Sequence, residues 1–115
     1  MDANMTVKLN DICGIINQTV KTDKIYLFGS FACGVPHEGS DFDLYVVIPD
    51  DGPRPIDAMK QIRSALYKRH ETPLDILVGR AGEFERRRDI ATIERKVYRE
   101  GVVIHEQQAS EQSMV

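Results

Sequence analysis

Apolar residues recur at three- and four-residue steps in two stretches of the chain, which is the period of an amphipathic helix. The stretches cover residues 5–18 and 55–68, and their apolar stripes are Leu9, Ile12, Ile16 and Val20, and Ile56, Met59, Ile62 and Leu66. A third helical region, in one or two pieces, is predicted to end at Gly101 as its C-cap. Its apolar anchors are Phe84, Ile90, Ile93 and Val97.

Four other stretches are typical of β-strands. Residues 25–28 and 74–78 are short apolar runs, and residues 102–104 form a candidate edge strand. From position 42 the apolar residues alternate, so the predicted strand has Phe42, Leu44, Val46 and Ile48 on one face and Asp41, Asp43, Tyr45 and Val47 on the other. The two aspartates therefore point to the same side.

Turns separate the predicted elements. Gly29 ends the first strand, and Ser30 can cap a short helix that continues to Cys33. Residues 79–82 are predicted to turn the chain again before the last helical region. The resulting order is αβαβαβαβ, which is that of an α/β domain.

Length and composition narrow the class of protein. The 115 residues are 42% hydrophobic and 29% charged, which suits one domain with its own hydrophobic core. We expect this domain over residues 1–105 and a disordered tail over residues 106–115. Neither the cysteines nor any apolar run indicates a disulfide framework, a zinc site, a membrane span or a signal peptide. A cytoplasmic location is expected.

Charge is spread unevenly along the chain. Acidic residues gather between positions 38 and 57, and basic residues gather between positions 80 and 99. An acidic middle would attract metal cations, and a basic final segment could face phosphates or an acidic partner, although solvated helix faces are the better explanation for most of the arginines. The net charge of -3 disfavours nucleic-acid binding, as does the lack of an interleaved aromatic and basic strip.

Candidate chemistry gathers between positions 27 and 44. At Gly29-Ser30 the main chain can approach a ligand closely and present free amides to an anion, so this common type of turn is a candidate phosphate cradle. Asp41 and Asp43 repel each other on one strand face unless solvent or a cation relieves them. Mg²⁺ takes one or two such carboxylates and completes its shell with water and substrate phosphates. Taken alone, the pair is better explained by a solvated strand end. Asp50 and Asp51 are near enough in sequence to compete as metal ligands, although their loop context favours exposure to solvent.

Asp75 interrupts the apolar run 74–78. An unpaired carboxylate buried in such a strand would cost several kcal/mol or be forced to protonate. An ion pair with an arginine of the last helical region would be a structural explanation. The functional explanation is that Asp75 joins Asp41 and Asp43 as the third ligand of a two-metal site.

The combined pattern resembles the nucleotidyltransferases of the DNA polymerase β superfamily, most specifically their minimal single-domain members. Those members have the pattern G-S-x-x-x-G, a short loop, and then S-D-x-D-L. This chain matches the fixed positions with Gly29, Ser30, Gly34, Ser40, Asp41, Asp43 and Leu44. The resemblance covers roughly residues 5–105. It implies an α/β fold with a small mixed sheet of three to four strands flanked by helices.

The resemblance also implies an activity, which is transfer of a nucleoside monophosphate from ATP to an acceptor hydroxyl with two Mg²⁺ ions. The implied catalytic and metal-binding residues are Asp41, Asp43 and Asp75, and the implied nucleotide-binding residues are Gly29, Ser30 and Ser40. In the family the third acid helps to bind the catalytic metal and draws the proton from the attacking hydroxyl. The acceptor attacks the α-phosphate in line, and pyrophosphate leaves.

The acceptor is expected to be another protein, because 115 residues leave no room for an acceptor domain. Minimal members of the family are frequently encoded beside a small helical HEPN ribonuclease toxin, which they bind and can inactivate by attaching AMP to a tyrosine. By this resemblance the chain is expected to be an antitoxin. The alternatives are a non-catalytic antitoxin that only binds its partner, and a homodimeric small-molecule nucleotidyltransferase whose second subunit supplies the acceptor pocket.

One stretch departs from the family pattern. Many minimal members have one or two arginines between the serine and the second glycine, whereas this chain has Phe-Ala-Cys between Ser30 and Gly34. A cationic contact to the phosphates is therefore missing from this loop, and reduced triphosphate affinity is expected. Arg54 or an arginine of the last helical region could replace it.

Overall fold

Eight helices and strands make up the described part of this computed structural model, which comprises residues 3–32, 41–69 and 74–106. In chain order they are α1 (Ala3–Thr19), β1 (Lys24–Phe28), β2 (Phe42–Ile48), α2 (Pro55–Arg69), β3 (Leu74–Arg80), α3 (Ala81–Arg87), α4 (Ile93–Glu100) and β4 (Val102–Glu106). The helices α1 and α2 exceed the predicted ranges by at most two residues at either end.

The strands form one four-stranded sheet in the order β3-β2-β1-β4. β1 pairs antiparallel with both β2 and β4, whereas β2 and β3 run parallel because α2 connects them as a crossover. The sheet is therefore mixed, which confirms the α/β fold class implied by the resemblance. Its register aligns Phe28 of β1 with Asp43 of β2, and Asp43 with Asp75 of β3.

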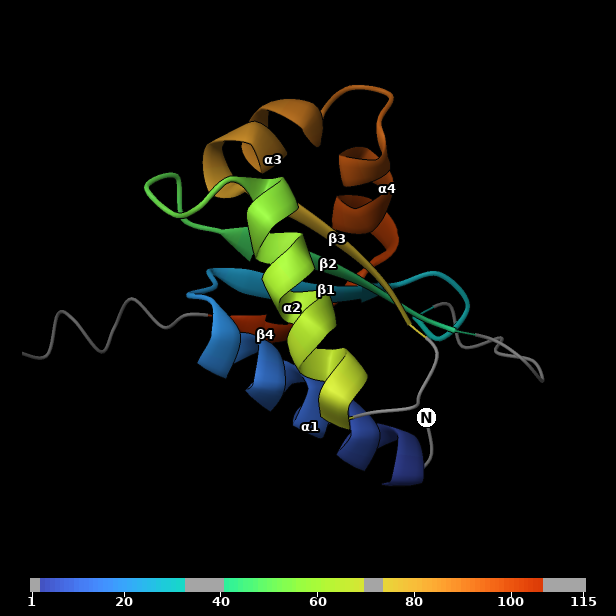
Figure 1. Ribbon diagram of the computed structural model, residues 1–115. Coiled ribbons are helices and arrows are strands. Elements are labelled where there is room, and N and C mark those ends of the chain that lie inside the picture. The colour runs from blue at the N-terminus through green and yellow to red at the C-terminus, as the bar shows by residue number, and fades with distance from the viewer. Residues whose placement is uncertain (1–2, 33–40, 70–73, 107–115) are drawn as a thin grey trace, which may run out of the picture.

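Helices cover both faces of this sheet, as Figure 1 shows with α1 below it and α3 and α4 above it. α1 and α2 pack on one face over a core that includes the fully buried Ile12, Ile16, Leu44 and Ile62. α3 and α4 cover a smaller cluster on the other face, formed by Tyr26, Phe28, Tyr45, Val47, Phe84 and Val97. Burial of these apolar side chains on both faces holds the three layers together.

The alternation predicted for the second strand is confirmed in β2. Its even-numbered residues from Phe42 to Ile48 lie in the core under α1 and α2, whereas Tyr45 and Val47 lie in the cluster under α3 and α4. Asp43 shares the face of Tyr45, because side chains two residues apart in a strand point the same way. The strand period thus directs Asp43 to the side of the sheet that α4 covers.

The predicted short helix after Gly29 is wrong for the described residues, because positions 30–32 form a turn. Gly29 has a φ of 77° and reverses the chain direction. Phe31 then packs on Phe42 with 4.6 Å between ring centroids, which anchors the turn to the core. Cys33 lies outside the described residues. The described elements therefore follow the order αββαβααβ.

The turn predicted at residues 79–82 is also wrong. Gly79 and Arg80 complete β3 opposite Val47 and Ile48 of β2, and α3 begins at once with Ala81. Parallel pairing with β2 therefore outweighs the local turn signal of the glycines.

Two of the apolar anchors predicted for the last helical region are not buried. The region is split into α3 and α4, so only Phe84 and Val97 are buried, whereas Ile90 is 54% exposed and Ile93 is 40% exposed. A single helical period does not continue across the break between the two helices.

The predicted edge strand is confirmed in β4, which pairs with β1 and extends to Glu106. Gly101 is the C-cap of α4, as predicted, and its N–H donates to the Val97 carbonyl at 2.8 Å. Residues 107–115, where a disordered tail is expected, lie outside the described residues. Within the described ranges, no helix is both long enough and apolar enough to cross a membrane.

Candidate active site

The three acids singled out in the sequence lie at one end of the sheet, where β2 and β3 begin. Asp43 and Asp75 are register partners on these neighbouring parallel strands. Asp41 directly precedes β2, two positions before Asp43 on the same face. Asp41 and Asp75 are exposed, and Asp43 is partly buried. The fold thus brings together three carboxylates from two strands.

Asp43 responds electrostatically to its neighbours. Burial raises the pKa of its carboxyl, and the charges of Asp75 and Asp41 raise it further, while Lys96 opposes the shift. The charges of Asp75 and Asp41 therefore repel the Asp43 carboxylate. A divalent cation between them would relieve this repulsion, and carboxylate oxygens are the donors that Mg²⁺ prefers.

Removal of the Asp43 charge should stabilise the ligand-free chain. The raised pKa means that ionisation of Asp43 costs stability, and this cost appears as the pH rises from the ordinary aspartate value of 3.8 through the pKa of the folded state. We therefore expect Asp43→Asn to raise the thermal midpoint by a few degrees at pH 7, with the gain vanishing below that ordinary value. Thermal unfolding across this pH range measures it. Equal midpoints at pH 7 would contradict the repulsion.

The phosphate-binding turn predicted at Gly29-Ser30 lies against these carboxylates. Gly29 follows β1 directly, and a Cβ atom built on it would lie 2.2 Å from Oδ2 of Asp43. Only a glycine permits both this close approach and its φ of 77°. The backbone of the turn therefore borders the Asp43 carboxylate. Gly34 and Ser40, which complete the sequence motif, lie outside the described residues.

Asp75 differs from the sequence expectation in its surroundings. The sequence predicted a carboxylate buried in an apolar strand, but Asp75 is exposed. It lies on the face of the sheet opposite to the buried Ile76, where α3 and α4 cover side chains of β1 and β2. Among the described residues, no ion pair joins it to an arginine. The burial argument is therefore wrong, whereas the strand register still places Asp75 beside Asp43.

The acids are neighbours and do not form a closed ligand cluster. In the described part of the chain, no three histidine, cysteine, aspartate or glutamate side chains converge closely enough to hold a metal ion by themselves. The open set of carboxylates fits Mg²⁺ in particular, because this ion usually takes one or two protein carboxylates and fills its shell with water and substrate phosphates. A site for one or two such ions at Asp41, Asp43 and Asp75 stays a prediction.

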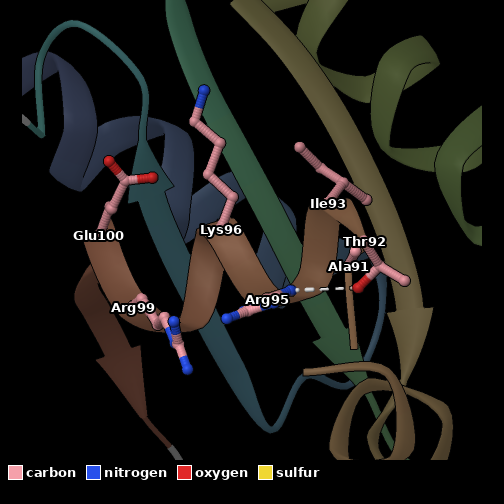
Figure 2. A pocket seen from close by; sticks show the side chains of 7 residues that line it. All are labelled: Ala91, Thr92, Ile93, Arg95, Lys96, Arg99 and Glu100. Carbon is pink, nitrogen blue, oxygen red and sulfur yellow. Dashed lines mark hydrogen bonds between the residues drawn. The ribbon is translucent and has the colours of Figure 1, made fainter. Parts of the chain in front are cut away.

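Lys96 of α4 is a residue of this region that the sequence did not single out. Figure 2 shows its side chain extending from α4 toward the end of the sheet where β2 and β3 begin. Its charge acts on the Asp43 carboxyl. In the sequence Lys96 is only one cation of a basic stretch, so no spacing or period distinguishes it. Its proximity to the candidate active site depends on how α4 packs on the sheet.

Glu94 fixes the packing of α4. Its carboxylate accepts hydrogen bonds from Nε of Arg87 at 2.9 Å and from the Tyr45 hydroxyl at 2.8 Å. Burial alone would raise the pKa of Glu94, but the hydrogen bonds from Arg87 and Tyr45 outweigh it, so the pKa is lowered and the charge is kept. Val97, which is fully buried, holds the same helix against the sheet.

Loss of the Glu94 carboxylate should loosen α4. Glu94→Ala removes both hydrogen bonds and leaves the buried Tyr45 hydroxyl without a partner, so we expect a loss of about 2–3 kcal/mol in the free energy of unfolding. Urea denaturation measures it, with the exposed Glu100→Ala at the end of α4 as the matched control. A loss no larger than that of the control would show that the network does not hold the helix.

In the turn that lacks the arginine, an aromatic side chain packs into the core. Where many minimal members have a cation, Phe31 packs against the core residue Phe42. Arg54, one proposed replacement, pairs instead with Asp57 at the start of α2, with 2.9 Å between Nε and Oδ2. Asp50 likewise has another role, since its Oδ1 accepts the backbone N–H of Gly82 in the first turn of α3 at 2.8 Å.

The sequence from residue 9 to residue 105 matches the model of the nucleotidyltransferase domain. This match spans most of the 115 residues and includes the turn, the three acids and α4. The chain belongs to the nucleotidyltransferase domain family. It is therefore a transferase that handles nucleotides, and the carboxylates and the glycine turn form its candidate active site.

Solved structures share this nucleotidyltransferase fold. A Sulfolobus solfataricus protein, provisionally described as a nucleotidyltransferase, is 19% identical with a TM-score of 0.62 over 88% of this chain and 79% of its own. A chain of a toxin–antitoxin complex with AMP-PNP is 22% identical with a TM-score of 0.56 over 90% and 77%. A chain from a complex of tri-AMPylated Shewanella oneidensis HEPN toxin with MNT antitoxin is 20% identical with a TM-score of 0.53 over 94% and 77%. No curated protein sequence matches this nucleotidyltransferase domain significantly.

Proposed function

We propose that this nucleotidyltransferase is an antitoxin that uses Mg²⁺ and ATP to attach AMP to a tyrosine hydroxyl of a partner HEPN toxin. The observation that supports the chemistry is the alignment of Asp43 with Asp75 across parallel strands, with the Gly29 turn against the Asp43 carboxylate. The proposed partner is supported by the fold shared with chains of HEPN toxin and MNT antitoxin complexes.

Each part of the proposed site has a defined task. The amides of the turn at Gly29 and Ser30 bind the β- and γ-phosphates of ATP. Asp41 and Asp43 hold Mg²⁺, which supplies charge neutralisation and polarises the phosphate oxygens. Asp75 accepts the proton of the tyrosine hydroxyl as the tyrosine oxygen forms a bond to the α-phosphorus. The bond from that phosphorus to the bridging oxygen breaks, and pyrophosphate leaves.

The proposed toxin-binding surface is the exposed face of α4. A groove of about 620 Å³ lies along this helix, and its lining includes Ile93 and the cationic Arg95 and Arg99 (Figure 2). Ile93 is 40% exposed within this groove, and Ile90, which precedes the first lining residue in sequence, is 54% exposed. An acidic toxin surface with an apolar centre complements this combination of charge and exposed aliphatic side chains.

Transfer of a radioactive label tests the proposed function. The chain is incubated with ATP labelled at the α-phosphate, Mg²⁺ and a purified candidate partner of the HEPN type, and the products are separated by size. Label on the toxin that disappears in Asp43→Asn supports the proposal, and mass spectrometry then identifies the modified residue. Label only on small molecules would favour the homodimeric small-molecule enzyme instead.

A non-catalytic antitoxin is the second candidate, and the packing of Phe31 on Phe42 favours it, because the turn has no cation where many relatives have one. In that case the toxin would bind and be inhibited equally well by the parent chain and by Asp43→Asn, without any label transfer. Measurement of toxin ribonuclease activity beside the transfer assay distinguishes the two candidates.

A further inference from the structure

The candidate active site combines several negative charges with few positive ones. Asp41, Asp43 and Asp75 lie at the same end of the sheet, and the turn beside them has Phe31 where a cation would face the phosphates. ATP adds further negative charge when it binds. A cation that reaches this end of the sheet would therefore have a large effect on binding of the triphosphate.

The packing of α4 directs Lys96 to this end of the sheet. Val97, the next residue, is buried in the same cluster as Phe28, and Phe28 is the register partner of Asp43. At the end of the helix, a Cβ atom on Gly101 would lie 3.3 Å from the carbonyl oxygen of Leu27, so α4 lies close to the final residues of β1. Lys96 extends from this helix toward the start of β2 and β3 in Figure 2.

Lys96 is also available to a ligand. Its side chain is exposed, and no ion pair within the described ranges involves it. Glu94 meanwhile ties α4 to α3 and to β2 through Arg87 and Tyr45. The aliphatic part of the Lys96 side chain therefore extends from a helix whose position is fixed, while its ammonium can contact an anion.

We propose that Lys96 positions the triphosphate of the nucleotide, with its ammonium contacting the β- and γ-phosphate oxygens in place of the arginine that the loop lacks. This inference rests on the proposed use of ATP and assigns a residue to it. It also gives α4 two roles along one helix, since Lys96 is one of the residues that line the groove proposed for the toxin.

Binding of Mg·ATP and of AMP to the isolated chain tests this role without any acceptor. For Lys96→Met we expect the dissociation constant for Mg·ATP to rise about tenfold, which corresponds to about 1.4 kcal/mol, while the constant for AMP stays unchanged. Lys96→Arg should retain most of the ATP affinity, because it keeps the charge. Lys8→Met, an exposed lysine on α1, is the matched control.

Each outcome of this experiment decides a different point. Unchanged ATP affinity in Lys96→Met, or equal losses for ATP and AMP, would overturn the positioning role while leaving the proposed function intact. Failure of the parent chain to bind Mg·ATP at all would overturn the proposed function itself. Far-ultraviolet circular dichroism confirms that each variant is folded, and Lys96→Gln replaces Lys96→Met if the latter is not.

Discussion

Asp43→Asn is expected to reduce nucleotidyl transfer at least about a hundredfold while leaving the chain folded, because it removes a carboxylate that would hold Mg²⁺, and that ion would neutralise the negative charge of the transition state. Asp43 is the centre of the candidate site. It is in register with both Phe28 and Asp75, and the charges of Asp75 and Asp41 contribute to the raised pKa of its carboxyl. Initial rates of label transfer to the toxin under saturating Mg·ATP measure the effect.

Asp51→Asn is the matched control for this substitution. Asp51 is an exposed acid of the loop between β2 and α2, and the sequence alone left it as a competing metal ligand. The Asp51→Asn variant should retain nearly the full transfer rate. Equal losses in the two variants would mean that the carboxylates of the sheet have no special role. A transfer rate that survives Asp43→Asn would remove Asp43 from the proposed mechanism.

Gly29→Ala has the second large expected effect. An alanine at a φ of 77° is strained by about 1–2 kcal/mol. Its Cβ would also lie 2.2 Å from Oδ2 of Asp43, so that the carboxylate or the turn must move. We expect a lower thermal midpoint together with a loss of transfer of about a hundredfold, since small displacements of reacting groups have effects of that size.

Gly14→Ala provides the control for the change of residue type. Gly14 lies within α1, and an added Cβ there would meet no atom within 4 Å. This variant should be more stable than the parent by up to about 1 kcal/mol, because alanine favours a helix over glycine, and its transfer rate should be unchanged. If Gly29→Ala were as stable and as active as Gly14→Ala, the turn would not constrain Asp43.

The long helices and β2 were predictable because their apolar side chains repeat over many residues. α1 follows the stripe that the sequence showed, and the alternation along β2 placed Asp43 on the correct face. The stripe of α2 holds for Ile62 and Leu66, which are buried, whereas Ile56 in the first turn is 48% exposed. Short segments were harder to predict, because they contain too few residues to show a period. The turn after Gly29 and the continuous passage from β3 into α3 depend on contacts with Phe42 and β2, which local sequence signals do not report.

Exposure of Asp75 illustrates the same limit within the site. Its apolar neighbours in sequence indicated a buried strand, whereas the helices that cover each face decide burial. Ile76 lies in the core under α1 and α2, but on the face of Asp75 the helices α3 and α4 cover side chains of β1 and β2. The motif correctly associated Asp75 with Asp43, but the reason inferred from burial was wrong. The register between β2 and β3 is what brings the two residues together.

The sequence by itself determined the fold class, the position of Asp43 on its strand and the need for glycine at a turn, because these follow from residue periodicity and local backbone chemistry. Only the tertiary structure decided which distant groups meet. The network of Glu94, Arg87 and Tyr45 fixes how α4 lies on the sheet, and that placement directs Lys96 toward the end of the sheet where β2 and β3 begin. Such contacts between distant segments leave no periodic trace in the sequence.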